Sequence, residues 1–307
     1  MAKIEALRTP DERFAVLPYF PYEPHYVESL PGFDGLRLHY VDEGPKDAKD
    51  VYLCLHGEPD WAYLYRKMIP VFKASGARVV APDFFGFGRS DKPIADSDYT
   101  YSFHRETLTA FIRELDLTNI TLVCGDWGGI LGLTLPMEMP ERFKRLIVMN
   151  TALPTGNGLS DDFEMWKTFV AQFHDIPVPG VLAVFCPGGL DLMDMAAYAA
   201  PFPDARYQGG VRRFPQMVPV APGMDGVEQC KRARKFLSEQ WQGESFMATG
   251  LLDTALGKTV MDELRSVIRG CPEPLELPEA GHFVQESGEE IAIAALASFG
   301  IKVDLGP

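Results

Sequence analysis

The sequence predicts an α/β fold: a mostly parallel sheet flanked by helices, with a helical cap inserted after the sixth strand. Short apolar segments alternate with helical patterns along most of the chain, which is typical of a parallel sheet covered on both faces. One interval breaks this alternation. Between Asn150 and Glu244 no clear strand is visible, but several short helical patterns occur among many Pro, Gly, Met and aromatic residues. A structureless loop of that length is rare in a compact domain, so this interval is interpreted as the cap.

The expected strands are short apolar segments at 36–42, 51–55, 78–82, 120–124, 145–150, 244–250 and 274–278. Helical patterns lie at 103–115, 129–138, 258–269 and 289–299. Residues 11–35 are rich in Pro, Phe and Tyr and are expected to form an irregular lead-in. Gly and Pro clusters at the ends of the cap suit linkers. We therefore expect a core domain over 1–154 and 226–307 and a cap over 155–225.

Bulk composition limits the classes of partner. The chain has 307 residues, of which 46% are hydrophobic, and a formal net charge of −14. This charge argues against binding to nucleic acid or an anionic membrane, since both require clustered Lys and Arg. The N-terminus has no signal-peptide core, and no window approaches the roughly 18 uninterrupted apolar residues of a membrane span. Five scattered cysteines without a Cys-x-x-Cys pair favour a reduced, cytoplasmic protein.

The most informative motif is Val123-Cys124-Gly125-Asp126-Trp127-Gly128-Gly129, where a predicted strand runs through a sharp turn into a helix. In the α/β-hydrolase fold, this nucleophile elbow exposes its tip residue above the sheet, and small neighbours let the turn close. The tip residue here is Asp126. A serine would indicate acyl transfer, whereas a carboxylate indicates attack on an electrophilic sp3 carbon through an alkyl-ester intermediate.

The base and the acid of a triad are sought further along the chain, because this fold orders them as nucleophile, acid, histidine. His282 follows the last predicted strand and is the only one of six histidines late enough in the chain. Asp253 lies on the loop after the strand 244–250, where ligand-facing residues of open α/β sheets collect. Asp262 is the competing acid, but it falls inside a helical pattern. Position 150, after the preceding strand, is an asparagine.

Two backbone N–H groups are expected to form an oxyanion hole, one from the loop after the strand 51–55 and one from the residue after the nucleophile. In His56-Gly57-Glu58-Pro59, Pro59 has no N–H. The expected donors are therefore the N–H groups of Glu58 and Trp127. The Glu58 side chain is either a surface carboxylate or a group that holds the hydrolytic water.

Two tryptophans are candidates for binding the leaving group. Indole is a donor-only group on a large apolar body, so it can bind an anion and exclude water. Trp127 follows the nucleophile directly, and Trp166 lies early in the cap. A single tryptophan is more often a core residue. If the cap folds over the elbow, however, the two indoles bind one halide between them. The other histidines show no metal-ligand spacing, so no metal site and no cofactor are expected.

These motifs together resemble the haloalkane dehalogenases of the α/β-hydrolase superfamily, in the branch whose catalytic acid follows the post-cap strand. The resemblance covers nearly the whole chain and also includes the segments 20–26, 56–59, 86–93 and 280–286. It implies hydrolysis of a small haloalkane to alcohol, halide and a proton. The family's roles fall on Asp126 as nucleophile, His282 as base and Asp253 as acid, with Trp127 and Trp166 as halide-binding residues.

The same resemblance implies a substrate pocket lined from the cap. The matching positions are Phe163, Phe214, Pro215 and Val218. One position departs from the family, since Gly125 stands where relatives often carry glutamine. The implied partners are the haloalkane and the halide ion, and the chain is expected to be a monomer or a weak homo-oligomer.

Two rival functions remain open at this point. An epoxide hydrolase uses the same Asp-His-Asp set and often the same elbow, and needs cap tyrosines to protonate the epoxide oxygen. Tyr198 and Tyr207 are available for that role. A non-catalytic ligand-binding protein with the same fold is the second rival. Glu58 and Trp166 favour the dehalogenase over the first, and an intact triad argues against the second.

Overall fold

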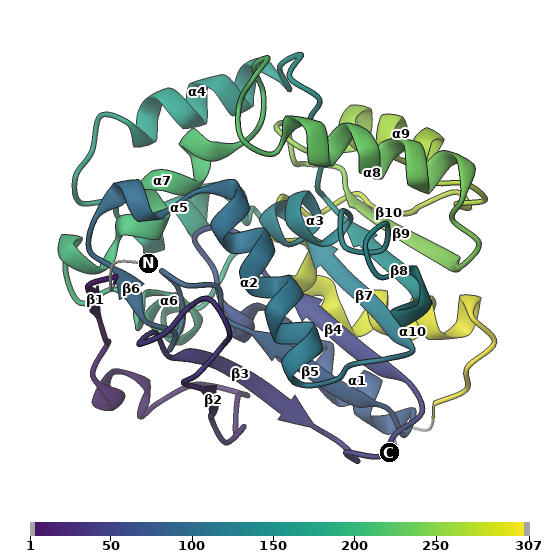
Figure 1. Ribbon diagram of the computed structural model, residues 1–307, viewed down its shortest axis with the longest axis horizontal. Coiled ribbons are helices and arrows are strands. Elements are labelled where there is room, and N and C mark those ends of the chain that lie inside the picture. The colour runs from purple at the N-terminus through teal and green to yellow at the C-terminus, as the bar shows by residue number, and fades with distance from the viewer. Residues whose placement is uncertain (1–3, 304–307) are drawn as a thin grey trace.

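The computed structural model describes residues 4–303, and an eight-stranded sheet forms its centre (Figure 1). The strands are β2 (His25–Val27), β3 (Leu38–Glu43), β4 (Val51–Leu55), β5 (Arg78–Pro82), β7 (Ile120–Gly125), β8 (Phe143–Met149), β9 (Glu244–Gly250) and β10 (Leu275–Leu277). Their order across the sheet is β10-β9-β8-β7-β4-β5-β3-β2. Within this eight-stranded sheet, the pairs β2–β3 and β3–β5 are antiparallel and the other neighbours are parallel. The predicted mostly parallel sheet is confirmed.

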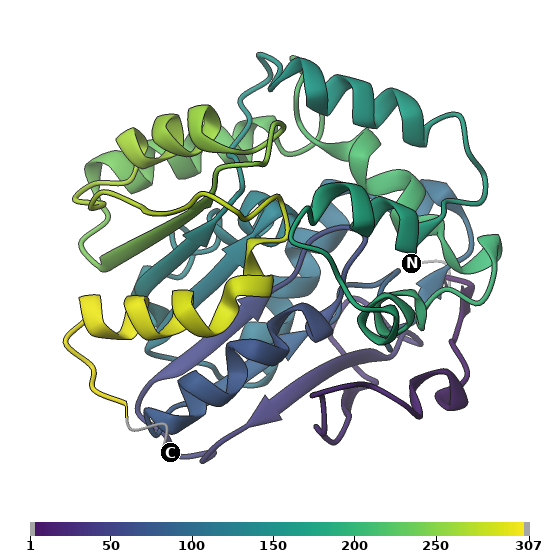
Figure 2. The same ribbon diagram turned by 180° about the vertical axis from the view of Figure 1, so that it is seen from behind.

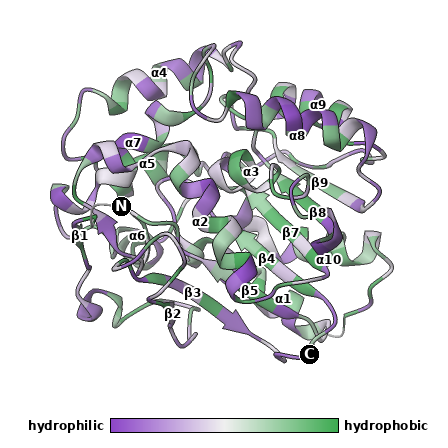
Figure 3. Ribbon diagram, in the orientation of Figure 1, coloured by the Kyte–Doolittle hydropathy of each residue, from purple (hydrophilic) through white to green (hydrophobic). Residues whose placement is uncertain are grey.

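The central strands are apolar because both faces of the sheet are covered. In β4 and β7 every residue is buried, and Leu53 of β4 pairs with Val80 on one side and Leu122 on the other. Such continuous apolar strands are typical of parallel sheets buried between helices. Figure 3 shows the same pattern, with hydrophobic colour along β4 and β7 and hydrophilic colour on the outer side of α8 (Val227–Glu239).

Helices cover both faces of the sheet. Helix α2 (Tyr101–Glu114) lies in front of the sheet in Figure 1, whereas α1 (Ile69–Ala74) and α10 (Gly288–Ser298) lie in front of it in Figure 2. Helix α3 (Asp126–Gly132) follows β7 directly, and α9 (Lys258–Val267) packs near α8 and β9. Within residues 4–303, no helix is long and apolar enough to cross a bilayer.

Two expected elements differ in the structure. The helical pattern at 129–138 is shorter than predicted, since α3 begins at Asp126 and ends at Gly132. The apolar run continues beyond that point, but Pro136 removes a backbone donor and disfavours helical conformation in the residue before it. The lead-in 11–35 is not wholly irregular, because His25–Val27 forms the edge strand β2 and pairs with β3. A second, two-stranded sheet pairs β1 (Ala6–Leu7) with β6 (Lys92–Pro93).

Four helices lie between β8 and α8 in the chain: α4 (Asp161–Val170), α5 (Val178–Phe185), α6 (Leu192–Ala199) and α7 (Gly209–Met217). They gather at the end of the sheet where β7 leads into α3 (Figure 1). Strand β8 is the sixth strand of the central sheet in chain order, so the predicted place of the cap is confirmed. The cap therefore covers the carboxyl ends of the parallel strands, where ligands of open α/β sheets bind.

Candidate active site

Asp126 occupies a strained turn between β7 and α3. Its φ is +44°, in the left-handed region that few non-glycine residues adopt. Its backbone N–H donates to the carbonyl of Asn150 at 2.9 Å, and its carbonyl accepts from the Thr151 hydroxyl at 2.6 Å. The turn also requires Gly128, because a Cβ there would lie 1.9 Å from the backbone oxygen of Leu55. These contacts direct the Asp126 side chain away from the sheet.

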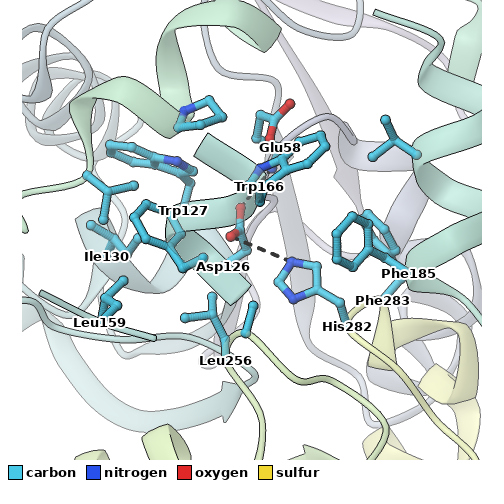
Figure 4. A pocket seen from close by; sticks show the side chains of 15 residues that line it. Glu58, Asp126, Trp127, Ile130, Leu159, Trp166, Phe185, Leu256, His282 and Phe283 are labelled. Atoms are coloured by element: carbon cyan, nitrogen blue, oxygen red, sulfur yellow. Dashed lines mark hydrogen bonds and ion pairs between the residues drawn. The ribbon is translucent and has the colours of Figure 1, made fainter. Parts of the chain in front are cut away.

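The imidazole of His282 joins two carboxylates. Its Nδ1 lies 2.8 Å from Oδ2 of Asp253, and its Nε2 lies 3.6 Å from Oδ2 of Asp126. Burial alone would lower the pKa of His282, but the two carboxylates outweigh burial and hold that pKa well above its ordinary value. Figure 4 shows the imidazole next to the Asp126 carboxylate, with the ion pair drawn as a dashed line. The structure thus brings together all three residues expected to form the triad.

Asn150 also belongs to the site. The sequence analysis noted only that this asparagine cannot serve as the acid of the triad. Its side-chain amide donates to Oδ2 of Asp253 at 2.9 Å, and its oxygen accepts from the N–H of Gly250 at 2.9 Å. Burial would raise the pKa of Asp253, but His282, Asn150 and the N–H of Leu256 lower it to about 2. Asp253 is therefore an ionised carboxylate in a fixed orientation. Asp262, the rejected competitor, is on α9 with a 45% exposed side chain and pairs with Lys258.

The loop after β4 brings a backbone donor to the nucleophile. The N–H of Glu58 donates to Oδ1 of Asp126 at 2.8 Å. The Glu58 side chain is buried, and its Oε1 has no hydrogen-bond partner. Burial and the neighbouring carboxylates of Asp126 and Asp60 raise the pKa of Glu58 well above its ordinary value, whereas His282 and the indole of Trp166 oppose this rise. The Glu58 carboxyl is thus not the surface carboxylate of the simpler interpretation.

These groups face one cavity between the core and the cap. Its empty volume is about 570 Å³, including the part open to solvent. The lining combines the polar groups of Glu58, Asp126 and His282 with two indoles and apolar side chains. The lining residues that sequence reasoning missed are Ile130, Leu159, Val181, Phe185, Ala255, Leu256 and Phe283. They come from separate segments of the chain, and no local pattern distinguishes them from core residues.

The four tryptophans of the chain divide into two kinds. The indole N–H groups of Trp61 and Trp241 donate to protein oxygens, the Ala197 carbonyl at 3.1 Å and the Ser245 hydroxyl at 3.0 Å. Trp127 and Trp166 line the cavity, Trp127 from the elbow and Trp166 from cap helix α4, where its indole interacts with the Glu58 carboxyl. Within residues 4–303, the indole N–H of Trp127 has no protein acceptor. Figure 4 shows both indoles around the Asp126 carboxylate.

Of the four residues expected to line the pocket from the cap, Phe163, Pro215 and Val218 border the cavity. Phe214 does not, which corrects the expectation for that residue. Its ring is fully buried and packs 4.7 Å from the Trp127 ring, measured between centroids. Because the Trp127 indole borders the cavity and Phe214 packs against that indole and Phe87, Phe214 supports the lining without being part of it.

The two tyrosines that an epoxide hydrolase would need do not line the cavity. Tyr198 is buried elsewhere, with its hydroxyl donating to Oε1 of Glu286 at 2.5 Å. Tyr207 lies in a short 3-10 turn, half-buried, and is likewise absent from the lining. Neither hydroxyl is therefore placed to protonate a substrate next to Asp126.

Comparisons with known proteins agree with this geometry. A family model of the α/β-hydrolase fold matches residues 51–289. A haloalkane dehalogenase of Psychrobacter cryohalolentis is 43% identical over 94% of this chain and 96% of its own length. A haloalkane dehalogenase of Mycobacterium marinum is 39% identical over 94% and 98% of the two chains.

Solved structures give the same result. The tetrameric haloalkane dehalogenase of Paraglaciecola agarilytica NO2 is 56% identical and superposes with a TM-score of 0.95, covering 97% of this chain and all of the other (100%). The epoxide hydrolase alternative is not favoured. The chain belongs to the haloalkane dehalogenases, enzymes of the α/β-hydrolase fold that hydrolyse carbon–halogen bonds.

Proposed function

We propose that Asp126, His282 and Asp253 form the catalytic triad of this dehalogenase, that the N–H groups of Glu58 and Trp127 form its oxyanion hole, and that Trp127 and Trp166 bind the halide. The observation that carries this proposal is that the two oxygens of Asp126 make different contacts. Oδ1 accepts from the Glu58 N–H, and Oδ2 faces His282 across the cavity. Oδ2 is thus the oxygen free to attack a substrate.

In the first step, Oδ2 of Asp126 attacks the halogen-bearing carbon, a C–O bond forms and the C–X bond breaks. The halide leaves with the bonding electron pair, and the two indole N–H groups donate to it. The apolar lining supports this step, because hydrogen bonds to an ion are stronger where water is excluded. The product of the step is an alkyl ester of Asp126.

In the second step, His282 Nε2 takes a proton from water while the water oxygen attacks the ester carbonyl carbon. The negative charge develops on Oδ1, where the Glu58 N–H already donates. One such donor contributes about 3–4 kcal/mol in acyl transfer. The tetrahedral species collapses by breaking the bond between the carbonyl carbon and the alkoxide oxygen, and His282 returns the proton to the alkoxide. Asp126 is regenerated, and alcohol, halide and one proton are released.

The Glu58 side chain is proposed to hold the hydrolytic water. Its unpaired Oε1 is buried beside the elbow, and the residue lines the cavity. A buried oxygen without a partner loses the free energy of a hydrogen bond, which a bound water restores. The same carboxyl is close enough to Asp126 for the two charges to interact.

The substrate is proposed to be a small haloalkane. The cavity is lined mainly by apolar side chains and has only a few polar groups, all of them near Asp126, an arrangement that suits a small apolar molecule. Phe163, Pro215 and Val218 would contact its alkyl chain. The cap 155–225 closes this space over a core of 1–154 and 226–307, a division supported by the position of helices α4 to α7. Residues 1–3 and 304–307 of that core lie outside the described residues.

The test is acid production with a pH indicator, using 1,2-dibromoethane, 1-bromobutane and styrene oxide, the last assayed for diol. We expect acid from the bromides and no turnover of the epoxide. Asp126→Asn should release no halide, whereas Asp262→Asn, which changes an exposed carboxylate on α9, should match the wild type. Diol from the epoxide without acid from the bromides would replace this proposal with the epoxide hydrolase.

Self-association is the proposed oligomeric behaviour. The relative from Paraglaciecola agarilytica forms a tetramer. In this chain, Met165 and Phe169 on α4 and Phe173 just beyond its end are 64%, 40% and 42% exposed, so exposed apolar side chains gather at this part of the cap. Light scattering should show a mass above the monomer that falls in Phe169→Glu. A monomer at all concentrations would contradict this.

A cytoplasmic location is proposed as well, supported by five cysteines that are all free thiols.

A further inference from the structure

A buried charge cluster lies beside the loop that carries His282. Arg66, in the 3-10 turn η2 (Ala62–Lys67), has a fully buried side chain. Its Nη1 donates to Oε1 of Glu286 at 2.8 Å, and its Nη2 donates to Oε2 at 2.7 Å. A bidentate pair of this kind fixes both distance and orientation. Glu286 lies four residues after His282. The guanidinium thus holds the end of the segment 282–286, which we call the histidine loop.

The same guanidinium reaches the cap. Its Nη2 lies 3.1 Å from Oδ2 of Asp194 on α6, and its Nη1 donates to the Tyr198 hydroxyl at 3.2 Å. Tyr198, also on α6, donates in turn to Oε1 of Glu286. The hydroxyl of Tyr63 donates to Oδ1 of Asp194 at 2.6 Å. The residues Tyr63, Arg66, Asp194, Tyr198 and Glu286, which we call the Arg66 cluster, thus join the core, the cap and the histidine loop.

Backbone hydrogen bonds connect Glu286 with His282 along the histidine loop. The N–H of Val284 donates to the carbonyl of His282 at 2.9 Å, and the N–H of Glu286 donates to the carbonyl of Phe283 at 3.0 Å. The N–H of His282 itself donates to the carbonyl of Phe185, the last residue of cap helix α5, at 3.0 Å. These bonds link the backbone of His282 both to Glu286 and to cap helix α5.

Stability alone does not account for such a cluster. Burying an ion pair removes hydration from both charges, and apolar residues of the same shape are often as stable. What the charged version adds is a defined geometry. That geometry matters at the imidazole, because His282 Nε2 must lie within reach of both Asp126 and the attacking water.

We propose that Arg66, Glu286 and Tyr198 are positioning residues. They bind the histidine loop to cap helix α6 and so keep the His282 imidazole next to Asp126. The proposal rests on the proposed function, in which His282 acts only in hydrolysis of the ester. Loosening the Arg66 cluster should therefore slow ester hydrolysis and leave ester formation nearly unchanged. A misplacement of about 1 Å can reduce a catalysed rate by about 100-fold.

The kinetic test uses two variants that keep the shape of the side chain. Tyr198→Phe removes the contacts of the hydroxyl with Arg66 and Glu286, and Asp194→Asn removes the negative charge beside Arg66. In single-turnover experiments with 1-bromobutane, the bromide burst should stay within about twofold of the wild-type rate. Hydrolysis of the ester should fall about tenfold or more, so that the added mass of the alkyl group accumulates on the Asp126 peptide. The control is Glu244→Gln, which weakens the pair between the exposed Glu244 and the buried Arg145 near the start of β9 and β8. This pair lies at the opposite end of these strands from the site, so the variant should change neither step. An equal loss in both steps, or no loss, overturns the proposal.

A second measurement does not depend on turnover. The Nδ1 proton of His282, hydrogen-bonded to Asp253, should give a downfield proton resonance in the wild type. In Tyr198→Phe and Asp194→Asn this resonance should shift or exchange faster with water, and in Glu244→Gln it should not. An unchanged resonance in both cluster variants overturns the positioning role. If the wild type released no halide, the proposed function would fail, and this resonance would still decide whether the Arg66 cluster orients the imidazole.

Discussion

At the scale of single residues, the charge of Asp126 controls the state of His282. The carboxylates of Asp253 and Asp126 hold the pKa of His282 well above its ordinary value, against the effect of burial. In the proposed mechanism Asp126 becomes an ester and loses its charge, so one of the two causes of the raised pKa of His282 disappears. The imidazole then releases its proton more readily and becomes the base that the second step requires. Ester formation therefore prepares its own hydrolysis.

Replacing His282 by glutamine should separate the two steps. His282→Gln keeps a polar side chain but has no basic nitrogen, so the ester should form and remain. We expect one equivalent of bromide from 1-bromobutane, no further turnover, and the mass of a butyl group on the elbow peptide. The exposed His174→Gln serves as control and should behave as wild type. Loss of activity without any adduct would instead place His282 in the first step.

At the scale of elements, the elbow depends on how closely β7, β4 and the histidine loop approach one another. Gly128 leaves no room for a side chain against the backbone of β4. Gly125, the position that departs from the family pattern, is different. A Cβ there would lie 2.4 Å from Nε2 of Gln285, the end of a side chain, and 3.1 Å from the carbonyl of Met149. The side-chain amide of Gln285 near Gly125 can move, whereas the backbone carbonyl of Leu55 near Gly128 cannot.

This contrast predicts two different losses of stability. Gly125→Ala should reduce the free energy of unfolding by about 1–2 kcal/mol, since the Gln285 amide can shift. Gly128→Ala should reduce it by more than about 3 kcal/mol or prevent folding. Gly188→Ala meets no atom within 4 Å and should stay within about 0.5 kcal/mol of wild type. Urea unfolding measures all three. Equal effects at positions 125 and 128 would contradict this account of the elbow.

The proposed halide site is shared between two elements, because Trp127 belongs to the elbow and Trp166 to cap helix α4. Trp166→Phe keeps an aromatic ring and removes one N–H donor. A hydrogen bond to a charged group contributes about 1.5–3 kcal/mol, so bromide affinity should fall by about 10- to 100-fold. Quenching of tryptophan fluorescence by bromide measures it. Trp241 donates its indole N–H to Ser245, so the control variant Trp241→Phe should retain the wild-type affinity for bromide. An unchanged affinity in Trp166→Phe would show that Trp166 does not belong to the halide site.

At the scale of the whole molecule, buried carboxylates make the fold sensitive to acid. Burial would raise the pKa values of Asp253 and Asp83, but hydrogen bonds and neighbouring histidines lower both to about 2. Because these folded-state pKa values lie below those of the unfolded chain, the two groups stabilise the fold above about pH 4. That contribution is lost as the pH falls through about 2.

Each of these carboxylates should contribute about 2 kcal/mol to the free energy of unfolding at neutral pH. Asp253→Asn should therefore be less stable at pH 6 but lose about 2 kcal/mol less than wild type between pH 5 and pH 2. Asp262→Asn, on the surface of α9, should keep the wild-type dependence. Urea unfolding at several pH values tests this, and parallel curves for Asp253→Asn and wild type would rule it out.

The sequence alone predicted a mostly parallel sheet, seven of the eight strands of that sheet and the place of the cap, and it supplied the proposed site residues that stand in recognisable motifs. Asp126 was proposed as the nucleophile because a strand, a tight turn and a helix follow one another in a few residues, and His282 was proposed as the base because it follows the last strand. Both inferences use local rules of backbone geometry and chain order. The end of α3 could have been predicted from Pro136 by the same rules.

Only the tertiary structure decided which side chains meet across the fold. Asn150 contacts Asp253, Phe214 packs against Trp127 instead of lining the cavity, and Arg66 joins Glu286 to the cap. Each contact links segments far apart in the chain, and its partner is chosen by packing. The sequence specifies which groups need a partner when buried, but three-dimensional packing selects the partner, because the free energy of a buried contact depends on everything that surrounds it.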